Sequence, residues 1–140
     1  MLRNPTRLAA VAALVCLHAC VGHSGVRPLR PLELATAPYT PVISSSMTGS
    51  LGYEGDCLLF RDDETKAMFF PIWPLGSTFN GTSVTFHEPA RAEQRVVIGE
   101  ELVISGASAA WPSLDPVAYA PFHHQCGATP FFVRRVGPAN

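Results

Sequence analysis

Residues 52–74 constrain the fold of this chain more than any other stretch. They contain two apolar runs, residues 57–60 and 67–73, separated by a charged segment, and Pro74 ends the second run. Apolar runs this short, bounded by turn-forming residues, are typical of strands rather than helices. The charged residues between them are typical of a solvated turn. The stretch therefore predicts a β-hairpin.

Neither run alternates cleanly between apolar and polar residues. A strand that is apolar throughout is covered on both faces, or belongs to a sheet that curls into a small barrel. Pro71 lies inside the second run and cannot donate a backbone hydrogen bond, so it predicts a strand edge or a bulge at that point.

The remaining alternating patterns predict further short strands. These are residues 47–53, 83–87, 95–98, 101–105 and 131–136. Residues 106–129 contain three prolines and no regular pattern, so we expect an irregular loop there. Five to seven short strands in about 90 residues predict an all-β fold, a small barrel or sandwich.

The N-terminus has the pattern of an export signal. Arg3 and Arg7 precede an apolar run at residues 8–17. This run has about half the roughly 20 residues that a membrane-spanning helix needs, but it suits the core of a signal peptide.

The segment Leu17-His18-Ala19-Cys20 follows, and it resembles the signal of bacterial lipoproteins. The resemblance implies cleavage before Cys20, lipidation of that cysteine, and anchoring in the bacterial cell envelope, at the outer membrane if the cell is Gram-negative. Ordinary cleavage near Ala19, giving a secreted or periplasmic protein, is the alternative.

Prolines recur every few residues after the signal, at positions 28, 31, 38 and 41. Such spacing favours an extended, semi-rigid backbone. We therefore expect a signal peptide over residues 1–19, a Pro/Ser-rich tether over 20–46 that lifts the domain off the membrane, and one domain over 47–137. For the tether, a proline-rich ligand of a partner module is the alternative.

Four motifs punctuate the expected domain: Gly55-Asp56-Cys57, Trp73-Pro74-Leu75-Gly76, Val97-Ile98-Gly99-Glu100 and Cys126-Gly127. Together they resemble small exported bacterial domains. The resemblance covers about residues 48–136 and implies a barrel like the OB fold. It carries over no catalytic residue.

Cys57 and Cys126 are the two cysteines of the expected domain. In an exported chain an even pair is typical of a disulfide. Closing a loop of about 70 residues would stabilise the fold by roughly 4 kcal/mol in the chain-entropy model. Two free thiols or a metal site are the alternatives.

The candidate metal ligands are His123, His124 and Cys126, because imidazole and thiolate bind zinc and copper. Adjacent histidines on an extended backbone point in opposite directions, and no second cluster has metal spacing. We therefore expect no bound metal and no other cofactor. An enzyme or metal-binding protein using these two histidines and His87 is the alternative.

The mature chain would have eight basic and eleven acidic residues, and the basic ones are scattered along the sequence. This pattern argues against nucleic acid as a partner. No motif supplies a catalytic residue, so we expect a binding or structural module rather than an enzyme. Its partners would be the membrane, through the lipid, and an envelope protein or a small ligand. A small ligand would contact Trp73, Trp111 and Phe122, although core packing is the commoner use of such residues.

Overall fold

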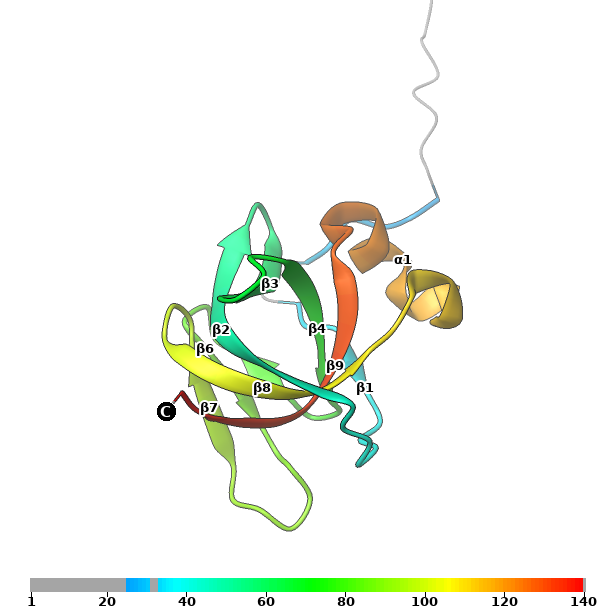
Figure 1. Cartoon of the computed structure of the whole chain (residues 1–140). Coiled ribbons are helices and arrows are strands. Elements are labelled where there is room, and N and C mark those ends of the chain that lie inside the picture. The colour runs from blue at the N-terminus through cyan, green and yellow to red at the C-terminus, as the bar shows by residue number, and fades with distance from the viewer. Residues whose placement is uncertain (1–24, 31–32, 140) are drawn as a thin grey trace, which may run out of the picture.

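The computed structural model describes residues 25–30 and 33–139 (Figure 1). The expected signal peptide and Cys20 lie outside these residues. The strands are β1 (Thr36–Ala37), β2 (Ser45–Glu54), β3 (Cys57–Asp62), β4 (Met68–Pro74), β5 (Thr78–Phe79), β6 (Ser83–Phe86), β7 (Gln94–Val97), β8 (Glu101–Ser108) and β9 (Thr129–Pro138). Two helices, the 3-10 turn η1 (Trp111–Ser113) and α1 (Pro116–Cys126), lie between β8 and β9.

Five of the strands close into a barrel in the order β2, β3, β4, β9, β8 and back to β2. All neighbours are antiparallel except β4 and β9, which run parallel. The prediction of an all-β fold, a small barrel or sandwich, is therefore confirmed as a small barrel, with nine strands in the described part of the chain in place of the expected five to seven. The hairpin expected at residues 52–74 is also present, as β3 and β4.

Pro71 lies where β4 changes its neighbour. Two strands pair with the same edge of β4, one after the other. β3 pairs with Met68 and Phe69 at the start of β4, and β1 pairs with Trp73 and Pro74 at its end. The missing N–H of Pro71 falls in the gap between these two pairings, so no ladder hydrogen bond is lost.

A second sheet of β5, β6 and β7 packs against the barrel and contributes to its interior. We call the apolar residues inside the barrel and under this sheet the inner core. Its buried members are Leu51, Leu58, Phe60, Trp73, Val84, Phe86, Val96, Leu102, Ile104, Phe131 and Val133. This core accounts for the inward side of the apolar runs.

A second apolar cluster, the outer layer, lies on the outside of β3 and β4. Its buried members are Ala35, Ala37, Cys57, Leu59, Phe70, Ile72 and Phe122. The N-terminal segment and α1 supply the cover, which is why both faces of β3 and β4 are apolar in the sequence.

The N-terminal boundary differs from the expected one. A tether is predicted over residues 20–46, but β1 and the first residues of β2 belong to the folded domain. The N–H groups of Trp73 and Leu75 donate to the carbonyls of Ala35 and Ala37, at 2.9 Å each. The prolines of this segment do not prevent pairing, because β1 needs only two residues at the edge of β4.

Residues 106–129 also differ from the irregular loop that their prolines predict. They contain η1 and α1. The Asp115 side chain accepts hydrogen bonds from the N–H groups of Val117 and Ala118, Pro116 occupies the first turn, and Gly127 ends the helix at a φ of 60°. These are standard start and stop signals. Pro121, in the middle of α1, and the lack of an amphipathic pattern hide the helix in the sequence.

Within the described residues, no helix has the length and apolar character needed to cross a membrane.

Candidate functional site

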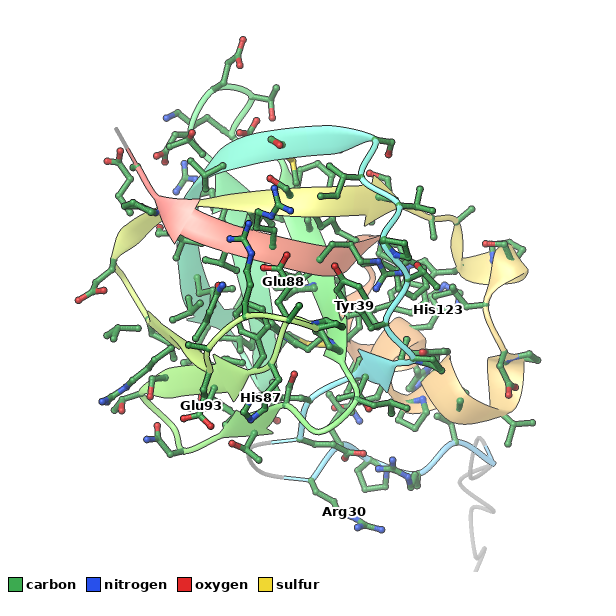
Figure 2. The ribbon with its side chains drawn as sticks, turned by 90° about the horizontal axis from the view of Figure 1, so that it is seen from below. Arg30, Tyr39, His87, Glu88, Glu93 and His123 are labelled. Atoms are coloured by element: carbon green, nitrogen blue, oxygen red, sulfur yellow. A yellow bond between two sulfur atoms is a disulfide. The ribbon has the colours of Figure 1, made fainter. Side chains whose placement is uncertain are left out.

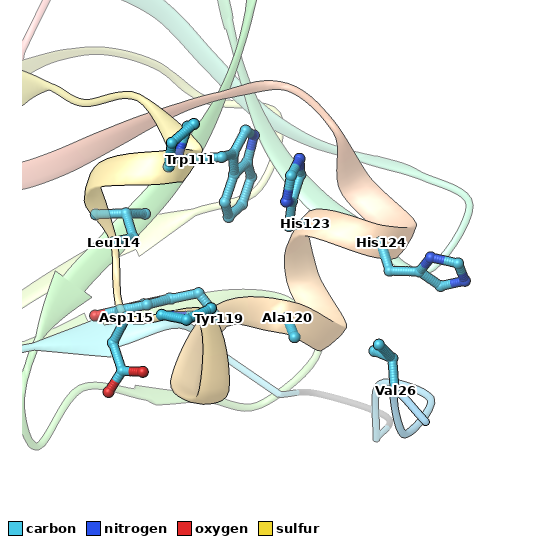
Figure 3. A pocket seen from close by; sticks show the side chains of 10 residues that line it. Val26, Trp111, Leu114, Asp115, Tyr119, Ala120, His123 and His124 are labelled. Atoms are coloured by element: carbon cyan, nitrogen blue, oxygen red, sulfur yellow. The ribbon is translucent and has the colours of Figure 1, made fainter. Parts of the chain in front are cut away.

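A groove of about 550 Å³ lies between η1, α1 and the first described residues (Figure 3). Its lining is mixed, with aromatic rings, prolines, two imidazoles and one carboxylate. The lining residues are Val26, Trp111, Pro112, Leu114, Asp115, Pro116, Tyr119, Ala120, His123 and His124. Its size lies in the range of small-ligand sites, roughly 300–1,000 Å³.

Trp111 forms a fixed wall of the groove. Its ring stacks on that of His123, with centroids 4.6 Å apart and an interplanar angle of 10°. The indole Nε1–H donates to the carbonyl of Ala128 at 3.0 Å. Phe70 of the outer layer packs against the indole, with the ring centroids 5.4 Å apart. The ring is therefore oriented by contacts that do not involve a ligand.

Tyr119 ties α1 to the barrel. Its hydroxyl donates to the carbonyl of Thr36 in β1 at 2.9 Å. Burial, and secondarily the negative charge of nearby Asp115, raise the pKa of Tyr119. The Asp115 carboxylate accepts from Val117 N–H at 2.9 Å and Ala118 N–H at 3.4 Å, so it also serves the helix. Among the described residues that line the groove, Asp115 is the one acidic or basic side chain, histidines aside.

The predicted disulfide is confirmed. Cys57 and Cys126 are bonded, with their Cα atoms 5.6 Å apart. The bridge fixes the last residue of α1 to the first residue of β3. Cys126 is therefore not available as a thiolate ligand, which removes one member of the candidate metal set.

The structure does not bring the three candidate histidines together. His123 points toward Trp111, whereas His124 turns away from it (Figure 3). His87 follows β6 and faces Glu93, with Nε2 and Oε2 3.1 Å apart, well away from His123 (Figure 2). Among the described residues, no group of three or more His, Cys, Asp or Glu side chains is placed to hold a metal ion.

Of the three aromatic residues predicted to contact a ligand, only Trp111 lines the groove. Trp73 belongs to the inner core and is 1% exposed. Phe122 is buried against Phe70, with ring centroids 5.3 Å apart. Trp73 and Phe122 line a separate cavity of about 10 Å³, which has room for at most about one water.

Sequence reasoning missed Tyr119 and Asp115. Residues four positions apart lie on the same face of a helix, so Tyr119 and His123 become neighbours once α1 is recognised. The helix could have been recognised from the pair Asp115-Pro116 as its start and from Gly127, eleven residues after Pro116, as its end.

Comparisons of this chain with protein-family models, with curated proteins and with solved structures find no match. The function of the groove is therefore argued from its geometry.

Proposed function

We propose that this protein is a lipid-anchored component of the bacterial cell envelope, and that its barrel is a binding module whose site is the groove beside α1. The lipoprotein-like segment ending at Cys20 supports the anchor. The disulfide supports an oxidising compartment outside the cytoplasm, because structural disulfides are rare inside it.

The observation that carries the binding proposal is the pre-formed wall of the groove. Trp111 is held by a hydrogen bond and by Phe70, and Tyr119 by its bond to β1. A disulfide fixes the helix that carries Tyr119 and His123. Rings immobilised before binding lose little conformational entropy on contact with a ligand, so such a surface favours affinity.

The chemistry of the lining narrows the ligand class. Stacked rings and prolines offer flat apolar contact, and the Asp115 carboxylate offers negative charge. Aromatic faces beside a carboxylate attract cations and repel anions. We therefore propose a neutral or cationic ligand with one flat apolar face. The polar groups of the groove already form hydrogen bonds within the protein: Trp111 N–H, Tyr119 O–H and the Asp115 carboxylate each have a backbone partner. The groove therefore offers a ligand its shape rather than unpaired reactive groups.

The test uses three probes of the same ring and different charge: benzyltrimethylammonium, benzyl alcohol and benzoate. NMR chemical shifts of the full mature chain are followed during titration with each. We expect shifts confined to Trp111 Nε1–H and α1, larger for the cation and the alcohol than for benzoate.

His123→Ala should weaken these shifts several-fold, while His87→Ala, at the far end of the domain, should leave them unchanged. Shifts spread over the whole surface, or strongest for benzoate, would contradict the proposal.

A further inference from the structure

We propose that the face of the domain formed by η1 and α1 lies against the membrane surface, so that the groove opens at the boundary between lipid and water. This rests on the lipidation of Cys20 proposed above. The occupant of the face is the headgroup layer of the bilayer.

Chain length places the groove close to the anchor. Six residue steps separate Cys20 from Val26, which lines the groove. A fully extended chain covers at most about 3.6 Å per residue, so these two residues are at most about 22 Å apart. That distance is smaller than the diameter of the domain, which is more than twice its expected radius of gyration of about 13 Å. The anchor therefore cannot lift this face far from the bilayer.

The residues after Val26 add little slack, because they are attached to the domain. Within the segment, both carboxylate oxygens of Glu33 accept hydrogen bonds from the Arg27 guanidinium, and one of them also accepts from the N–H of Arg30 at 2.8 Å, so these three residues are held close together. Leu29 packs against the outer layer, and β1 follows with its pairing to β4. The fixed part of the chain therefore begins beside α1 (Figure 1).

The same face is poor in charge. Asp115 is the one acidic or basic residue, histidines aside, in residues 102–133, and α1 itself has none. Val117 is 86% exposed, and Pro112 and Pro116 are also exposed. A surface with few charges, exposed aliphatic residues and a tryptophan costs little to place in the interfacial layer, where Trp is enriched.

The opposite end of the domain is charged. The loop between β6 and β7 points away from α1 (Figure 1) and carries His87, Glu88, Arg91 and Glu93. Buried Glu88 pairs with Arg91 and with Arg135 of β9, at 3.3 Å each. Immersing these charges would be costly, so water is the favoured environment of this end.

The test compares two exposed positions, Val117→Cys on α1 and Ala92→Cys in the loop between β6 and β7. Each variant is made as the mature, lipidated protein and labelled with a bimane fluorophore. It is then reconstituted in vesicles of phosphatidylethanolamine and phosphatidylglycerol that contain a lipid with a nitroxide on its headgroup. Intact mass with and without reductant verifies that the 57–126 bridge is kept.

We expect the nitroxide to quench the label at position 117 several-fold more than the label at 92. Equal quenching, or stronger quenching at 92, in protein whose mass shows acylated Cys20 would overturn the orientation while leaving the anchor in place. A label at 117 that is shielded from solvent but not quenched by lipid would show a second copy on this face, which also overturns it. A mass without acyl groups would instead overturn the proposed anchor, and this inference with it.

Discussion

The inner core and the outer layer are both apolar, yet they are assembled in different ways. The inner core fills a barrel that is closed by strand pairings, including those of β2 with β8 and of β4 with β9, and many of its side chains, such as Phe60 and Phe131, are fully buried. The outer layer instead consists of side chains on the outside of the barrel that the N-terminal segment and α1 cover, and its members Trp111 and Tyr119 remain partly exposed. A disulfide and side-chain hydrogen bonds reinforce the outer layer.

We infer that the inner core sets the stability of the barrel, whereas the outer layer shapes the proposed binding groove. The inner core can hold the barrel together without α1, whereas the outer layer supplies the walls of the groove. A covalent bridge is needed there because a short helix with a proline inside has little stability of its own.

The largest effect is expected from breaking the inner core. Phe131→Ala removes a side chain with 0% exposure and should lower the free energy of unfolding by about 3–5 kcal/mol. Urea denaturation measures this loss. Val42→Ala, at a position that is 61% exposed, is the control and should change stability by less than about 0.5 kcal/mol. Similar losses of stability in both variants would show that burial in the inner core is not what stabilises the barrel.

The second effect comes from removing the bridge in the double variant Cys57→Ala/Cys126→Ala. We expect a loss of about 2–4 kcal/mol. Hydrogen exchange should accelerate in α1 far more than in β2 and β8, since these strands pair with each other inside the barrel. Uniform acceleration through the whole domain would contradict the separate assembly of the two regions.

A smaller loss is expected from Tyr119→Phe, which removes the hydrogen bond from α1 to Thr36 but keeps the ring. The free energy of unfolding should fall by about 1 kcal/mol. Tyr53→Phe is the matched control, because Tyr53 is 50% exposed. If both variants lose the same amount, the hydroxyl of Tyr119 does not fasten the outer layer.

The smallest effect, with the opposite sign, is expected from Arg134→Met at the border of the two regions. Arg134 is 4% exposed, and its Nε and Nη1 atoms find no hydrogen-bond partner among the described residues. Its guanidinium lies over the rings of Phe132 and Tyr39, and burial lowers its pKa. Methionine keeps the apolar stem without the buried charge, so stability should stay constant or rise by about 1 kcal/mol. A loss of several kcal/mol in urea denaturation would show that the charge is satisfied.

The sequence predicts the inner core well because its signals are local. Short apolar runs, the charged turn and Pro71 each act within a few residues. The order of the strands is not encoded locally, since β2 pairs with β8 and β4 with β9 across more than fifty residues. The outer layer is harder to predict than the inner core, because Pro121 disguises α1 and the prolines of the N-terminal segment disguise β1. Trp111 and His123 could be proposed as individual residues, but their stacking and the role of Tyr119 depend on the helix.

Intact mass of the protein purified from its native membrane, with and without reductant, tests the lipid anchor and the disulfide together. We expect a chain that starts at Cys20 and carries acyl groups, and whose mass rises by two hydrogens when the 57–126 bridge is reduced in the unfolded state. An unacylated chain with two free thiols would contradict both the anchor and the bridge that holds the outer layer.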